Sequence, residues 1–116
     1  MSIERLHVGK RLSDAVIHDN RIYLAGQVPL NTAGQGVQAQ TEEVLANIDA
    51  LLAEAGSDKT KILSATIYLV DMATFDQMNA AWDVWVAPEA PPARACVEAR
   101  LARPGWGVEI SIVAAR

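Results

Sequence analysis

The chain has 116 residues, 51% of them hydrophobic, and carries a net charge of −4. This length predicts a single domain over residues 1–116 with one hydrophobic core. The mild acidity and the lack of a basic run argue against a nucleic-acid surface, because phosphate binding needs clustered Lys and Arg. No apolar stretch approaches the roughly 20 residues that cross a bilayer, and the N-terminus lacks the apolar core of a signal peptide. We therefore expect a cytoplasmic protein without a membrane partner.

The chain has one cysteine, Cys96, so an internal disulfide is excluded. His7 and His18 lie far from any Cys or carboxylate cluster at metal-ligand spacing, and no metal site is expected. We expect both histidines to be strand or turn residues without a chemical role.

The first half of the chain predicts three strands and a helix. Residues 3–8 alternate, and residues 15–18 and 21–25 flank Asp19-Asn20, two residues that tolerate positive φ and favour a two-residue hairpin. The helix that follows has an apolar stripe at helical spacing and ends at Gly56. The stripe comprises Val44, Leu45, Ile48, Leu51, Leu52 and Ala55.

The second half predicts strand, helix, strand and strand. Residues 62–70 are rich in β-branched side chains, which favours a central strand. Thr74 and Gln77 have the spacing of a capping box, so a second helix should begin near Thr74 and end before Pro88. Residues 93–101 and 108–114 complete the sheet, and we expect these two strands to pair about a turn near Pro104.

The predicted order, βββαβαββ, indicates an α+β domain with a mixed sheet and both helices on one face. The other face is substantially apolar, and one small domain has nothing left to cover it. We therefore expect a homo-oligomer. Trp82 and Trp85 should pack between helix and sheet, with a place in an interface as the alternative. Trp106, in a Pro-Gly-Trp-Gly loop, is a candidate to cap a cleft or a neighbouring subunit.

Arg94 lies in an otherwise apolar strand, two residues after the pair Pro91-Pro92. Its guanidinium stays charged in proteins and offers a planar fork of donors for a carboxylate or phosphate. Burying it is costly unless something pairs with it. The segment therefore indicates an anion site, or else a strand-end side chain that extends into solvent.

Seven short segments in this order resemble the Rid family of reactive-intermediate deaminases, also called the YjgF-like family. They span nearly the whole chain and lie at residues 23–29, 40–41, 44–48, 66–72, 78–79, 92–97 and 108–110. The resemblance implies a chorismate-mutase-like fold, and a homotrimer with a barrel-like core and sites between subunits. It implies hydrolysis of enamine or imine intermediates to 2-oxo acids and ammonia. That chemistry requires no metal or organic cofactor.

The resemblance also assigns roles to individual residues. Arg94 corresponds to the arginine that binds the substrate carboxylate, and Glu109 to the acid that orients water. The main chain of Cys96 and of Gly26 corresponds to substrate contacts, and Asn79 to a residue near the cleft. If the last two strands pair, Arg94 falls opposite Ala115, on the order of 20 Å from Glu109. Sites shared between subunits would agree with that distance.

The chain departs from the best-known members where they carry a Gly-Pro-Tyr-Ser motif with an aromatic side chain in the site. Residues 10–15 read Lys-Arg-Leu-Ser-Asp-Ala, in which Leu12 cannot supply the hydroxyl and Arg11 and Asp14 add charges. This indicates a subgroup that keeps the arginine and has its own substrate range.

Other interpretations remain open at this stage. Glu109 fits the solvent-facing position of an alternating strand, and Cys96 fits a small buried filler better than a nucleophile. Two other functions are compatible with the fold: non-catalytic binding of an oxo acid through Arg94, and a chaperone-like or ribonuclease-like role. Acidic charge makes the nuclease role the weakest of these.

Overall fold

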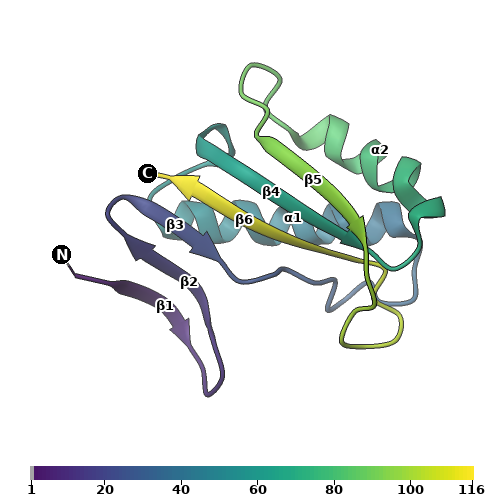
Figure 1. The fold of residues 1–116 in the computed structure, drawn as a ribbon, viewed down its shortest axis with the longest axis horizontal. Coiled ribbons are helices and arrows are strands. Elements are labelled where there is room, and N and C mark those ends of the chain that lie inside the picture. The colour runs from purple at the N-terminus through teal and green to yellow at the C-terminus, as the bar shows by residue number, and fades with distance from the viewer. Residues whose placement is uncertain (1) are drawn as a thin grey trace.

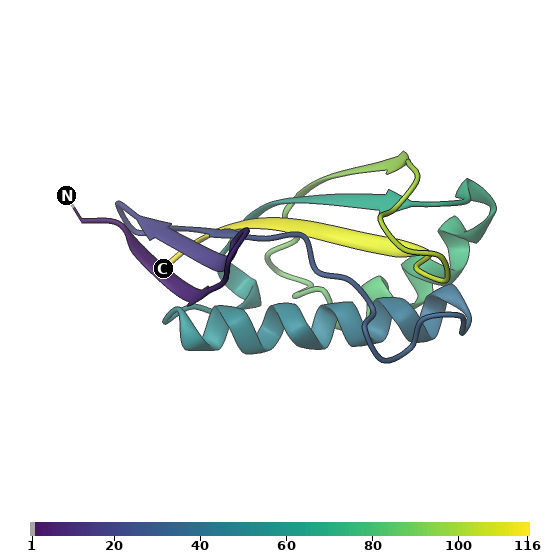
Figure 2. The same cartoon turned by 90° about the horizontal axis from the view of Figure 1, so that it is seen from below.

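The computed structural model describes residues 2–116, which form a six-stranded mixed sheet with both helices on one face (Figures 1 and 2). The strands are β1 (Glu4–Val8), β2 (Ser13–His18), β3 (Arg21–Leu24), β4 (Ile62–Leu69), β5 (Ala93–Glu98) and β6 (Val108–Ala115). The helices are α1 (Val37–Glu54) and α2 (Phe75–Trp85), with short 3₁₀ turns at Lys59–Lys61 and Met72–Thr74. The predicted order of elements is confirmed.

The sheet order is β1-β2-β3-β6-β4-β5, so the expected pairing of the last two strands is wrong. β4 lies between β5 and β6, parallel to the first and antiparallel to the second. Arg94 is opposite Ala65, whereas Ala115 is opposite Arg21 on β3. β5 also ends at Glu98, three residues earlier than expected, where the amide of Ala99 donates to the carbonyl of Leu69 at 2.9 Å.

Local turn signals predicted the hairpin and the end of α1 correctly. Asp19 and Asn20 have φ of 54° and 60°, as the two-residue turn requires. Gly56 has φ of 83°, a conformation open to glycine without steric penalty. The amides of Gly56 and Ser57 donate to the carbonyls of Ala53 and Leu52 at 3.1 and 2.8 Å. These two bonds satisfy carbonyls that the helix end would otherwise leave open.

The predicted capping box at Thr74 does not form. The Thr74 hydroxyl donates to the carbonyl of Asp71 at 2.6 Å, and it makes no capping bond to α2. Gln77 instead accepts a hydrogen bond from the amide of Val37 at 3.2 Å. Its side chain therefore satisfies an N–H group in the first turn of α1, which that helix itself leaves open.

The two helices pack on one another through aromatic side chains. Trp82 is buried, and its ring centroid lies 5.3 Å from that of Trp85. The Trp85 indole donates to Asp49 of α1 at 2.9 Å. Trp82 belongs to the buried core, as expected, whereas Trp85 is half-buried and lies against that core and α1.

The helices leave the other face of the sheet uncovered within the chain (Figure 2). Side chains along β6 alternate between buried and half-buried, as period-two geometry requires. Ile110 and Ile112 are on the helix side, and Glu109 and Ser111 are on the open side. The open face also exposes 44% of Tyr23 and 43% of Val97.

His7 joins the N-terminal hairpin to α1. Its Nδ1 lies 2.8 Å from a carboxylate oxygen of Asp14 on β2, and its Nε2 lies 2.8 Å from one of Glu54 at the end of α1. Its φ of 53° is uncommon outside glycine, although histidine, like asparagine, adopts it more often than most residues. The hydrogen bond to Glu54, followed by that to Asp14, raises the pKa of His7 above its ordinary value. The histidine therefore has a defined ionic role in the fold.

We expect this contact to make stability depend on pH in a particular direction. A raised folded-state pKa stabilises the protein below the unfolded value of about 6.5 and ceases to do so as pH rises through the folded value. His7→Asn removes the charge and keeps a residue that tolerates positive φ. The difference in melting temperature between wild type and this variant should be largest near about pH 6 and shrink toward about pH 9.

His18→Asn is the matched control, because the side chain of His18 makes no ion pair within residues 2–116. Its melting temperature should follow wild type across the same range. A His7→Asn difference that stays constant with pH would show that the contact does not depend on charge.

Candidate functional site

Arg94 lies on the edge strand β5 and extends along the helix side of the sheet. Its strand neighbour Ala65 is buried there, and residues opposite one another share a face. The Arg94 guanidinium donates to the amide oxygen of Asn79 on α2 at 2.8 Å. It also lies over the rings of Trp82 and Phe75, at 5.2 and 5.9 Å from their centroids. The expected neighbourhood of Arg94 and Asn79 is therefore present.

No carboxylate within residues 2–116 lies within ion-pair distance of Arg94. Asn79 supplies one neutral acceptor, the sulfur of Met78 is a weak second acceptor at 3.9 Å, and the rings supply weak electrostatic attraction to a cation. Most of the five guanidinium donors thus lack an acceptor from the protein. The arginine is held in place and keeps the capacity to bind an anion.

Cys96 lies two residues further along β5 on the same face, opposite Ile67. Burial raises the pKa of its thiol, and the nearby charge of Arg94 opposes this only in part. A raised pKa keeps the thiol protonated near neutral pH and makes it a poor nucleophile. The side chain packs against the core, which agrees with its interpretation as a filler.

Glu109 and Gly26 come together on the opposite, open face. Glu109 is opposite Tyr68 on β4, and Gln27 pairs through its backbone with Ile110, next to Glu109. A Cβ placed on Gly26 would lie 2.9 Å from the Cδ of Glu109 and would overlap its carboxylate. The glycine therefore leaves the room that this carboxylate occupies.

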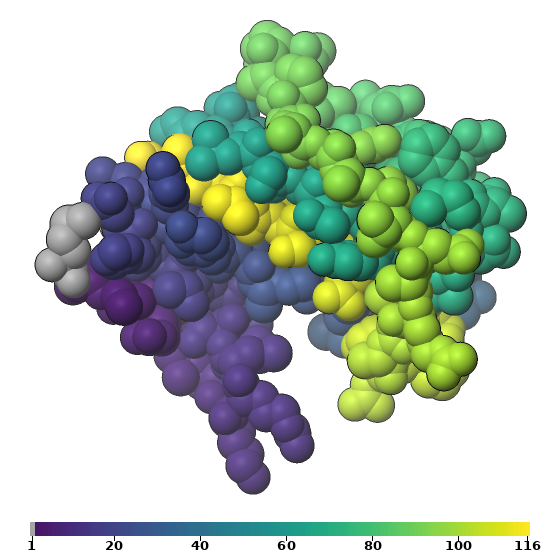
Figure 3. Space-filling model, in the orientation of Figure 1, coloured from purple at the N-terminus to yellow at the C-terminus, as the bar shows by residue number. Residues whose placement is uncertain are grey.

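Glu109 lines a hollow of about 340 Å³ on the open face. The other lining residues are Gly26, Tyr68, Ala99, Arg100, Leu101 and Ser111. Figure 3 looks onto this face and shows it hollowed between the β1–β2 turn and the loop that follows β5. The volume is at the lower end of the range for small-molecule sites.

The two candidate catalytic side chains are on opposite faces of one sheet. Ala65 and Tyr68 mark the levels of Arg94 and Glu109 on β4, three residues apart. An odd offset reverses the face. The Cα atoms of Arg94 and Glu109 are two strand spacings and three residue steps apart, roughly 14 Å. This is less than the distance on the order of 20 Å that follows if β5 and β6 pair directly. Because the sheet lies between them, Arg94 and Glu109 of the same chain cannot contact one small ligand at the same time.

Sequence reasoning missed Tyr68, Ser111 and Arg100 around Glu109. Period-two alternation could have found the first two, because Ser111 lies two residues from Glu109 and Tyr68 has the parity of the open face in β4. Arg100 was not identifiable, because its position depends on where β5 ends. Leu12 lies in the β1–β2 turn and is 58% exposed.

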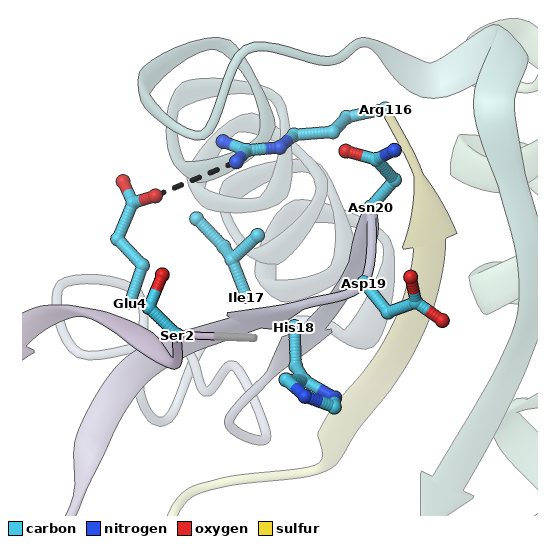
Figure 4. Close-up of a pocket in the computed structure, with 7 residues that line it drawn as sticks. All are labelled: Ser2, Glu4, Ile17, His18, Asp19, Asn20 and Arg116. Atoms are coloured by element: carbon cyan, nitrogen blue, oxygen red, sulfur yellow. Dashed lines mark hydrogen bonds and ion pairs between the residues drawn. The ribbon is translucent and has the colours of Figure 1, made fainter.

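The hollow drawn in Figure 4, about 330 Å³ in volume, brings together the two ends of the chain and the β2–β3 turn. Arg116 extends across it, donating to Glu4 at 3.4 Å and to the carbonyl of Ala55 at 3.2 Å. None of the predicted site residues lines it. Trp106 lines a further hollow, beside Arg103 in the loop before β6.

The described residues can be searched for a metal-binding group and for a membrane-spanning helix. Within residues 2–116, no group of three His, Cys, Asp or Glu side chains is arranged to hold a metal ion. No helix in that span has the length and apolar character to cross a membrane.

The chain is an α+β protein with the chorismate-mutase-like fold, as its similarity to solved structures of YjgF and L-PSP proteins shows. Residues 2–116 match the family described as Endoribonuclease L-PSP. The chain belongs to this family, which is the Rid or YjgF-like family of the sequence analysis.

Individual relatives cover almost the whole chain. A RutC family protein of Haemophilus influenzae is 53% identical over 114 residues, 98% of each chain. The crystal structure of a YjgF family member from Neisseria meningitidis has a TM-score of 0.93 at 52% identity, covering 100% of this chain and 96% of that one. A Rid family protein of unknown function from Yersinia pestis has a TM-score of 0.85 at 32% identity, covering 94% and 90%.

We predict that Gly26→Ala displaces the Glu109 carboxylate while the fold persists. The added methyl group overlaps a flexible side chain, which can rotate, so the free energy of unfolding should change by less than about 1 kcal/mol. A crystal structure of the variant should show Glu109 in a different rotamer. Gly36→Ala is the control, since its Cβ meets nothing nearer than 3.7 Å. An unmoved Glu109 in Gly26→Ala would contradict the role assigned to the glycine.

Proposed function

We propose that the protein hydrolyses reactive 2-imino acids, and their enamine tautomers, to 2-oxo acids and ammonia. The observation that carries this proposal is Arg94: a fixed guanidinium without a carboxylate partner in residues 2–116. Such a group binds the carboxylate that every 2-imino acid carries. Membership of the family supports the general assignment.

The chemistry needs few groups beyond a carboxylate clamp. Water adds to C2 of the protonated imine, and one of its two protons passes to the nitrogen to give a tetrahedral intermediate with a hydroxyl and an ammonium group on C2. The C2–nitrogen bond then breaks and ammonia leaves, while the hydroxyl proton is released to solvent and the C2–oxygen bond becomes a carbonyl. Glu109 accepts a hydrogen bond from the attacking water and orients it. Arg94 holds the substrate carboxylate, so both effects are positioning and proton handling. The backbone at Gly26 and Cys96 and the side chain of Asn79 complete the contacts.

We further propose that the active form is a homotrimer with sites between subunits. Arg94 and Glu109 point from opposite faces of the sheet, so a site containing both needs two chains. The open face, with exposed Tyr23 and Val97, would be covered in the same assembly.

An oxo-acid-binding protein without turnover is the second candidate, and the same unpartnered Arg94 supports it. RNA cleavage, which the family description names, is not favoured by this chain. Ten basic residues stand against fourteen acidic ones, and affinity for phosphate backbones depends on concentrated positive charge.

Arg94→Ala should lower kcat/KM for imine hydrolysis by roughly 100-fold or more, since it removes at least two hydrogen bonds to a charged group. Imines would be generated in situ by an amino-acid oxidase, and ammonia or 2-oxo acid release measured. Arg94→Lys should be intermediate, because an ammonium lacks the planar fork. The fold should persist, with a melting temperature within about 5 °C of wild type.

Arg103→Ala is the matched control, because it removes an exposed guanidinium from a loop away from Arg94. It should keep the wild-type rate. Full activity of folded Arg94→Ala would contradict the proposed role. Wild type that binds 2-oxo acids without accelerating any imine would select the binding protein instead.

A mixing experiment tests the shared site. Arg94→Ala and Glu109→Gln should each be inactive alone. The two variants are denatured together in equal amounts and refolded, so that their chains mix at random. About one quarter of the sites then combine an intact Arg94 from one chain with an intact Glu109 from another, and about one quarter of wild-type activity should return. Mixed wild type and Arg94→Ala provides the reference for refolding yield. No recovery from a folded oligomer would place the site within one chain.

A further inference from the structure

We propose that Arg100 binds a second anionic group of the substrate, so that the site prefers imines of acidic amino acids, the 2-imino dicarboxylates. This inference rests on the proposed function and adds the substrate class. It starts from the hollow of about 340 Å³ that contains Glu109, which Arg100 also lines.

Arg100 is an exposed cation without a fixed partner. It lies two residues after the end of β5, next to Ala99, whose amide donates to the carbonyl of Leu69. No ion pair or hydrogen bond within residues 2–116 engages its guanidinium, and it does not pair with Glu109 in the same hollow. The neighbouring acid Glu98 is already an acceptor for the amide of Met72 at 2.9 Å.

The hollow therefore presents two opposite charges that remain separate. Glu109 is surrounded by the hydroxyl-bearing side chains of Tyr68 and Ser111, which suit a water molecule and a polar substrate. In the proposed reaction Arg94 of a neighbouring chain holds the carboxylate next to C2. Arg100 is then a second guanidinium at the same site, and a monocarboxylate leaves it unused. A dicarboxylate satisfies both.

The proposal for Arg100 depends on its position beside Glu109 and not only on its charge, as a comparison with Arg103 makes clear. It is an exposed arginine of the same loop. Arg103 lines the hollow around Pro104 and Trp106 alone, whereas Arg100 lines both that hollow and the one that contains Glu109. Its removal changes the net charge of the loop by the same amount. Arg103→Gln is therefore the matched control for Arg100→Gln.

Two measurements test the proposal. The first is calorimetric binding of 2-oxoglutarate and 2-oxobutanoate, stable products that differ in the second carboxylate. Wild type should bind the dicarboxylate roughly tenfold more tightly, and Arg100→Gln should abolish that preference, as loss of one hydrogen bond to a charged group implies. Arg100→Lys should retain part of it, and Arg103→Gln all of it.

The second measurement is the ratio of kcat/KM for imines generated from glutamate and from 2-aminobutanoate. The ratio should fall about tenfold in Arg100→Gln, mainly through KM, because the distal carboxylate takes no part in bond making. Equal binding of the two oxo acids by wild type, or equal losses for both in Arg100→Gln, would overturn the inference. Failure of the proposed function would appear differently, as wild type that hydrolyses no imine at all.

Discussion

Alternation of side chains along a β-strand is the constraint on which the candidate site depends. The same period that buries Ile110 and Ile112 under the helices directs Glu109 and Ser111 to the open face. Arg94 is level with Ala65 and belongs to the helix side. Since a sheet has only two faces, the offset between Arg94 and Glu109 gives each chain two separate half-sites.

The two half-sites are built differently. On the helix side, Arg94 is held by aromatic rings and one amide oxygen from α2, a rigid element, so its orientation is fixed before any ligand binds. On the open side, the lack of a side chain at Gly26 leaves space for the Glu109 carboxylate. The backbone hydrogen bonds between Gln27 and Ile110 hold that glycine in place. Arg94 thus has side-chain support from α2, whereas Glu109 has backbone support through Gly26 and Gln27.

Sequence patterns predicted the elements well and their neighbours poorly. Helix stripes, the Asp19-Asn20 turn and the Gly56 helix end are local signals, each readable within about one or two turns of chain. Strand pairing is not local. The short connection before β6 favoured a hairpin with β5, but a helix between β4 and β5 permits the parallel pair that the structure has. Arg100 was missed for the same reason, because its surroundings follow from that order and from the early end of β5.

The uncovered face and the divided site have one solution in common. Tyr23 and Val97 expose apolar surface on the face where Glu109 is, and burying that surface against another copy provides a driving force for association. Under the proposed function, the same contact brings a foreign Arg94 to a resident Glu109 and Arg100. Stability of the assembly and completeness of the site then have a common physical origin. Under the same proposal, selection on either one maintains the other, and two chains together supply the few functional groups that the reaction needs.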